Sequence, residues 1–159
     1  MVNEVKEFIS KDEGETEKLA YDFAKTLSNN DIVVLDGNLG AGKTKFMYGL
    51  AKYFNIENLV SSPTFTIVNE YPLKEEKNNI KCVYHFDVYR LSGSDDFLDS
   101  IGTDYFSNGL CVIEWGKIIK DILPSSAIYI SIEHISSNDN FRKITIYEKG
   151  DISYENIRG

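Results

Sequence analysis

The chain is poor in basic residues, cysteine and uninterrupted apolar stretches, and each shortage excludes a class of protein. Its 17 lysines and arginines stand against 25 acidic residues, a formal net charge of −8. This argues against a free-standing binder of nucleic acid or anionic membrane, because both require a basic face. The two cysteines, Cys82 and Cys111, form no CxxC pair, so we expect small buried hydrophobes rather than a disulfide or a metal site.

Long hydrophobic runs are missing as well. No apolar segment approaches the roughly 20 residues that span a bilayer. The first ten residues carry Glu4 and Glu7 and lack the apolar stretch of a secretory signal. We therefore expect a soluble, cytoplasmic protein without membrane contact. At 159 residues, of which 42% are hydrophobic, the chain is long enough for one domain with its own core, and we predict a single domain over residues 1–159.

The apolar segments predict strands that alternate with helices. Runs at 31–36 and 109–115 are short, apolar and bounded by turn residues, as is typical of strands buried on both faces. Apolar residues at helical spacing predict helices near 13–28, with a capping box from Ser10 to Glu13, and after residue 44.

Further strands are predicted on both sides of the second buried run. Residues 5–9, 64–71 and 81–89 are strand-like, with a polar turn from Lys74 to Asn79. Alternating isoleucines around residues 128–132 and 144–146 predict a hairpin. The whole order indicates an α/β sheet, mostly parallel with antiparallel edge strands and with helices on both faces.

The motif with the clearest chemistry is a glycine-rich loop between the first buried strand and the next helix. Residues 37–44 have the form G-x-x-x-x-G-K-[ST], a phosphate-binding loop of the P-loop NTPases. Glycines allow several backbone N–H groups to face phosphate oxygens, and the following helix directs its positive end to the same anion. Lys43 would neutralise the outer phosphates, and the Thr44 hydroxyl would bind Mg²⁺. We predict from this loop that the chain binds a nucleoside triphosphate.

Two acidic residues are candidates for the metal and for the attacking water. Glu114 ends the apolar strand LCVIE, the position of a Walker B acid, and Asp87 follows similar residues in HFDVYR. The alternatives are a solvated carboxylate for Glu114 and a turn residue for Asp87, and spacing alone does not divide the two roles. Thr64 in SSPTF lies where GTPase-like proteins have a switch segment, although a proline turn that enters a strand explains the same residues.

Together, GNLGAGKT, SSPTFTIVNEY, HFDVYRL and CVIEW resemble the bacterial TsaE (YjeE) ATPase family over roughly residues 10–148. The resemblance implies an ATPase, weak alone, that acts with the TsaB–TsaD heterodimer to form N6-threonylcarbamoyladenosine beside the tRNA anticodon. It implies ATP or ADP and Mg²⁺ as ligands, with tRNA reached only through the complex. Asn38 and Lys45 depart from the residues that the family usually has.

Carried over residue by residue, the resemblance implies a site made of two groups. Catalytic roles go to Lys43, Thr64, Asp87 and Glu114, with Thr44 and Glu114 on the metal side. Nucleotide contacts go to Gly37, Asn38, Leu39, Gly40, Ala41, Gly42, Lys43, Thr44 and Lys45 of the loop, and to Thr16, Trp115 and Arg142. For the last three, a helix-terminal residue, a core aromatic and a solvated charge are the alternatives. His85 either orients Asp87 or is structural.

Two other functions fit a phosphate loop. A small-molecule kinase usually has an arginine-rich lid, whereas this chain has only Arg90, Arg142 and Arg158. A nucleotide-gated binding module without turnover is the third possibility. Tracing the γ-phosphate separates the three, because it is released by an ATPase, transferred by a kinase and retained by a binding module.

Overall fold

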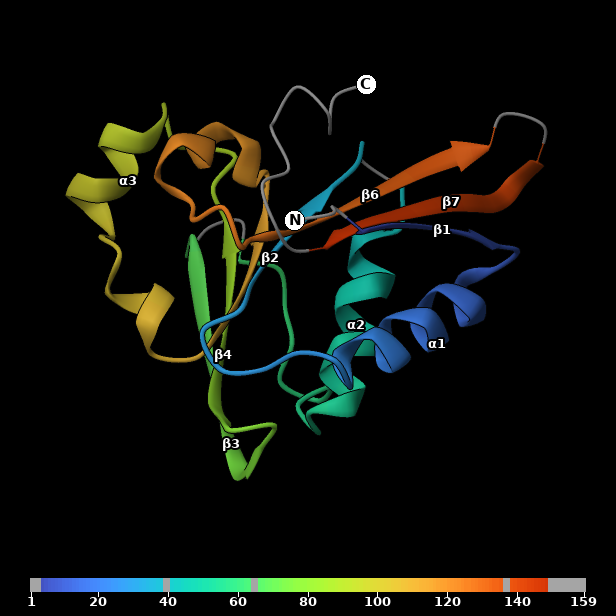
Figure 1. Ribbon diagram of the computed structural model, residues 1–159, viewed down its shortest axis with the longest axis horizontal. Helices are drawn as coiled ribbons and strands as arrows, with labels where there is room; N and C mark the ends of the chain where they lie inside the picture. The colour runs from blue at the N-terminus through green and yellow to red at the C-terminus, as the bar shows by residue number, and fades with distance from the viewer. Residues whose placement is uncertain (1–3, 39–40, 64–65, 136–137, 149–159) are drawn as a thin grey trace.

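The central feature of the fold is a seven-stranded sheet with helices on both sides (Figure 1). The computed structural model describes residues 4–38, 41–63, 66–135 and 138–148. The strands are β1 (Glu4–Ser10), β2 (Ile32–Asp36), β3 (Val68–Lys77), β4 (Ile80–Asp87), β5 (Leu110–Glu114), β6 (Ile128–Ile135) and β7 (Asn138–Glu148). The helices are α1 (Glu13–Ala24), α2 (Lys43–Tyr53) and α3 (Ser94–Ser100), with 3₁₀ helices η1 (Asp104–Ser107) and η2 (Gly116–Ile122).

Parallel pairing forms the middle of the sheet. The strand order is β1-β7-β6-β2-β5-β4-β3. β2 pairs in parallel with both β5 and β6, and β5 pairs in parallel with β4. β7 and β1 add an antiparallel edge beside β6, and β3 adds another beside β4. The predicted mixed α/β sheet is therefore confirmed.

The two faces of the sheet bury separate apolar clusters. Along β2, Val33 and Leu35 pack with α1 and α2, whereas Ile32 and Val34 pack toward α3, η1 and η2. Figure 1 shows α1 and α2 together on one side of the sheet and α3 on the other. The runs predicted to be buried on both faces, at 31–36 and 109–115, are β2 and β5, and four of the five residues in each are fully buried.

Three local expectations were wrong. The strand expected at 64–71 begins at Val68 and continues to Lys77, so the predicted polar turn at 74–79 shrinks to Asn78 and Asn79, both at positive φ. Exposed charged residues resemble a turn in the sequence, but residues 74–76 continue the edge strand through a stretch where its register with β4 shifts. Helix α1 ends at Ala24 rather than near residue 28.

The cap of α1 also differs from the expected box. Asp12, not Ser10, is the N-cap, and its side chain accepts a hydrogen bond from the Glu15 N–H at 2.8 Å. Glu15 in turn accepts from the Lys11 N–H at 2.8 Å. Ser10 bonds Thr16 instead, with 2.7 Å between the two hydroxyl oxygens.

Neither cysteine is set up for chemistry. Burial, and to a smaller extent the neighbouring Cys82, raises the pKa of the Cys111 thiol to about 12. Burial also raises the pKa of Cys82. Both are free thiols; Cys111 is buried, as expected, whereas Cys82 is only half-buried. None of the helices within the described ranges is both long and apolar enough to cross a membrane.

The carboxyl end of α1 is held by the turn between β3 and β4. The Asn78 side-chain amide donates to the carbonyls of Ala24 at 3.3 Å and Leu27 at 2.9 Å, and its carbonyl accepts from the Tyr53 hydroxyl at 2.9 Å. The Ala24 carbonyl also accepts from the Leu27 N–H at 3.1 Å, so the amide adds a second bond at the end of α1 and another to the turn that follows it. One side chain thus joins α1, α2 and the β3–β4 turn.

Asn78→Ala should therefore lower the free energy of unfolding by about 2 kcal/mol, because the bonds from its side chain to the Ala24 and Leu27 carbonyls and from Tyr53 are lost. The matched control is Asn55→Ala, since Asn55 also has a positive φ, 61° against 55° for Asn78. Urea unfolding followed by circular dichroism measures both. Equal losses in the two variants would mean that backbone strain alone, and not the bonds to α1, accounts for the effect.

Candidate functional site

The glycine-rich loop leaves the sheet at the carboxyl end of β2, its central strand. At Gly37 an added Cβ would lie 2.6 Å from the Ile132 carbonyl oxygen on β6, so only glycine allows this close approach. Gly42 is the N-cap of α2 with a φ of 115°, in the region that favours glycine. The loop therefore lies against β6 and leads directly into the amino terminus of α2. A helix amino terminus is suited to binding an anion.

Lys43 begins α2 and lies on an aromatic ring. Its side chain is almost buried, and its Nζ lies 4.4 Å from the centroid of the Trp115 ring. Trp115 has a positive φ of 64° and contacts the exposed Tyr89 with 4.8 Å between ring centroids. Trp115 thus packs on a neighbouring ring, as in the alternative of a core aromatic residue. It also supports the loop lysine.

The two candidate carboxylates lie on adjacent strands. Asp87 and Glu114 are partners in the parallel register of β4 and β5, and both end their strands. The Glu114 carbonyl accepts from the Val88 N–H at 3.2 Å, and the Asp87 carboxylate accepts from the Tyr89 N–H at 3.0 Å. Because β5 is also the parallel neighbour of β2, the carboxylates lie at the edge of the sheet from which the loop leaves.

Within the described residues, the hydrogen bond of His85 goes to Glu114 and not to Asp87. The distance from His85 Nε2 to Glu114 Oε2 is 2.7 Å. The expectation that His85 orients Asp87 rested on their spacing in HFDVYR. Residues two positions apart on a strand share a face, and their side chains point in parallel. A histidine therefore reaches a side chain on the neighbouring strand more easily than the one two positions along the same strand.

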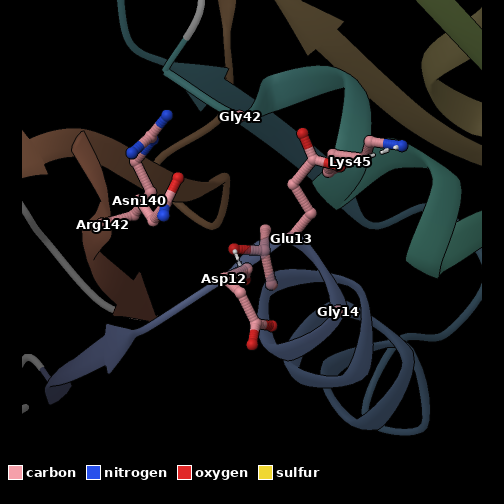
Figure 2. Close-up of a pocket in the computed structure, with 8 residues that line it drawn as sticks. Asp12, Glu13, Gly14, Gly42, Lys45, Asn140 and Arg142 are labelled. Carbon is pink, nitrogen blue, oxygen red and sulfur yellow. Dashed lines mark hydrogen bonds and ion pairs between the residues drawn. The ribbon is translucent and has the colours of Figure 1, made fainter.

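Thr16 and Arg142 both line a cavity of about 400 Å³ beside the loop. Figure 2 shows the three segments that border it: the start of α1, the start of α2 and strand β7. Lys45 pairs with Glu13 on one side at 3.5 Å, and Arg142 lies across from them. Arg142 Nε donates to the Ala41 carbonyl at 2.8 Å, which fastens β7 to the loop.

A second cavity, of about 410 Å³, also adjoins the loop. Gly37, Asn38, Ala41 and Trp115 line it, together with Ser131, Glu133 and His134 of β6. Asp36 borders it as well, in an ion pair of 2.7 Å with Lys117. Of the predicted nucleotide contacts, Thr16, Gly42, Lys45 and Arg142 line the first cavity, and Gly37, Asn38, Ala41 and Trp115 line the second.

Several lining residues were not found from the sequence. Asp12, Glu13, Gly14 and Asn140 border the first cavity with the predicted residues. Asn140 could have been found, because it precedes Arg142 by two positions on a strand and shares its face. The β6 residues carry no motif, and only the pairing of β6 with β2 brings them to the loop. Leu39, Gly40 and Thr64 lie outside the described residues.

The donor set matches magnesium better than zinc. The described ranges contain no cluster of three histidine, cysteine or acidic side chains that would hold a metal by itself. Magnesium, in contrast, is usually held by one or two carboxylates together with phosphate oxygens and water. Glu114 and the Thr44 hydroxyl offer oxygen ligands of this kind at the loop.

Comparisons with known proteins agree on one family. Residues 10–144 match the family described as "Threonylcarbamoyl adenosine biosynthesis protein TsaE". The chain is similar to the tRNA threonylcarbamoyladenosine biosynthesis protein TsaE of Bacillus subtilis, at 38% identity over 84% of this chain and 78% of that one. It is also similar to the protein of the same name from Aquifex aeolicus, at 36% identity over 91% and 98%.

A solved structure supports the same relationship. The chain superposes on the crystal structure of Bacillus subtilis YdiB with a TM-score of 0.71 and 29% identity, over 94% of this chain and 89% of that one. The likeness therefore extends over nearly the whole chain.

The contact between the loop and β6 can be tested without any ligand. Gly37→Ala should lower the free energy of unfolding by about 1–3 kcal/mol, because the new methyl group meets the Ile132 carbonyl. Gly93→Ala is the matched control, since its φ of 155° is close to the 158° of Gly37 but its Cβ meets nothing within 4 Å. Urea unfolding measures both, and equal losses would contradict the close approach.

Proposed function

Because the chain belongs to the TsaE family, whose role is in the threonylcarbamoyladenosine modification of tRNA, we propose that it binds and hydrolyses MgATP. In this proposal the triphosphate lies on the loop between β2 and α2. Hydrolysis serves the TsaB–TsaD heterodimer, and tRNA is reached only through that complex. The observation that carries the proposal is the placement of Asp87 and Glu114 side by side at the edge of the sheet where the loop begins.

The loop supports binding of the phosphates. Gly42 turns the chain into α2, so that the first backbone N–H groups of the helix are available to an anion. The ammonium of Lys43 lies on the ring of Trp115, and it would turn to the β- and γ-phosphate oxygens. The first cavity adjoins the loop, and with Thr16 and Arg142 it would receive the nucleoside.

The carboxylates support hydrolysis. Glu114 and Thr44 would hold Mg²⁺, which when bound neutralises charge on the phosphates. Asp87 would position a water molecule and accept its proton while the water oxygen bonds to the γ-phosphorus and the bond to ADP breaks. The products are ADP and inorganic phosphate. The acidic surface, with a net charge of −8, suits an accessory that docks on protein rather than on tRNA.

Lys43→Met should weaken binding of MgATP by about 10- to 100-fold, the effect of losing hydrogen bonds to a charged partner worth about 1.5–3 kcal/mol. Lys52→Met is the matched control. Lys52 also lies over an aromatic ring, that of Tyr48 at 5.1 Å, but in the last turn of the same helix. Calorimetric titration measures both variants. Comparable losses would mean that the loop does not bind the phosphates.

Asp87→Asn and Glu114→Gln should each reduce release of inorganic phosphate from ATP, in the presence of TsaB–TsaD, by about 100-fold or more. Affinity for ATP should change much less than turnover. Asp31→Asn is the control, because Asp31 directly precedes β2 at the opposite end of the sheet. Labelled γ-phosphate found on a metabolite would point to a kinase. If the chain binds TsaB–TsaD in none of its nucleotide states, the accessory role is contradicted.

A further inference from the structure

We propose that His85 is a positioning residue, which fixes the carboxylate of Glu114 in the orientation that Mg²⁺ requires. This inference rests on the proposed function, since it gives a structural residue a task in the binding of MgATP. It is carried by the contact between the two side chains, by the burial of the histidine and by its second ring nitrogen.

The contact crosses from one strand to the next. His85 is the register partner of Val112, and Glu114 is two residues further along β5. Val83 and Val112 both pack in the cluster beneath α1 and α2, so His85 and Glu114 lie on the same face as their strand neighbours. The imidazole therefore reaches diagonally, and its Nε2 lies 2.7 Å from Glu114 Oε2.

The geometry limits the freedom of Glu114. A glutamate has three side-chain torsions and, at a strand end, would sample several rotamers. The His85 side chain is 4% exposed and that of Glu114 is 15% exposed, so the donor cannot move with the carboxylate. A carboxylate has about four lone-pair positions, and the bond to Oε2 leaves others for a metal.

The second nitrogen of the ring shows that packing alone does not explain the histidine. Nδ1 of His85 is buried and has no hydrogen-bond partner within the described part of the chain. A buried polar atom without a partner costs free energy, whereas the buried residues beside it on β4, Val83 and Phe86, are apolar. The ring therefore directs one nitrogen to Glu114 at the expense of the other.

Hydrogen-bonded neighbours of a metal ligand commonly change metal affinity by about 10- to 100-fold when they are removed. For this chain, the affected quantity is the gain in nucleotide affinity that Mg²⁺ provides. It is measured by calorimetric titration with the β,γ-imido analogue of ATP, once with Mg²⁺ and once with EDTA. The ratio of the two affinities does not depend on turnover.

His85→Leu keeps an apolar side chain in the buried position but removes the donor. We expect the magnesium-dependent gain to fall about tenfold, with little change in affinity in EDTA. His85→Gln retains an N–H group at similar reach and should recover most of the gain. Val83→Ala is the matched control, because it removes buried volume from the same face of β4. It should lower stability and leave the gain unchanged.

Two results would overturn the inference. One is a folded His85→Leu variant with the full magnesium-dependent gain of the wild type. The other is a His85→Gln variant that loses as much of the gain as His85→Leu, because a packing defect would then explain both.

A double-mutant cycle separates this inference from the proposed function. His85→Leu and Glu114→Gln are combined, and the midpoints of urea unfolding are compared without nucleotide. Non-additive shifts support the pair, and additive shifts contradict it. If the wild type binds no nucleotide while the cycle is non-additive, the proposed function fails although the contact is real, and the magnesium role of His85 falls with it.

Discussion

The structure depends on one constraint, the pairing of β2 in parallel with a strand on each side. Such a strand is covered on both faces, and four of its five residues are fully buried. The chain that follows β2 therefore cannot form a hairpin beside it, and it leaves the sheet at the carboxyl end of β2. Parallel β5 and β4 end at the same edge, so the loop and the two carboxylates converge without any contact between distant surface elements. Ligands of open α/β sheets commonly bind at such an edge.

The order of elements and the loop could be predicted because their signals are local. Buried strands are apolar throughout, and the spacing of glycines before Lys43 follows from the shape of the loop. The pairing of Asp87 with Glu114 could not be predicted. It depends on β4 and β5 being neighbours, although 22 residues separate Asp87 from the start of β5. The contact of His85 with Glu114 could not be predicted for the same reason, because register across strands decides it.

Long-range pairing also explains which parts of the site were found. Arg142 was expected near the nucleotide only from family resemblance, and the structure brings it to the loop because β7 pairs with β6, which itself pairs with β2. Its bond to the Ala41 carbonyl is the last contact in this series. Asn140 and the β6 residues of the second cavity follow from the same pairing. The β6 residues have no local pattern that distinguishes them from an ordinary edge hairpin.

The contact between Lys43 and Trp115 suits a lysine that has to exchange partners. A cation over an aromatic ring gains about 0.5–2 kcal/mol, whereas a buried pair with a carboxylate is strongly destabilised when one partner leaves. The ring therefore holds the ammonium near the loop without a large cost for releasing it to phosphate. Trp115 takes this place through a left-handed backbone directly after Glu114, a conformation that is unfavourable for a bulky residue. Because such strain persists only where surrounding contacts maintain it, the packing of Trp115 on Tyr89 and the burial of Gly116 and Ile119 in η2 keep the ring under Lys43.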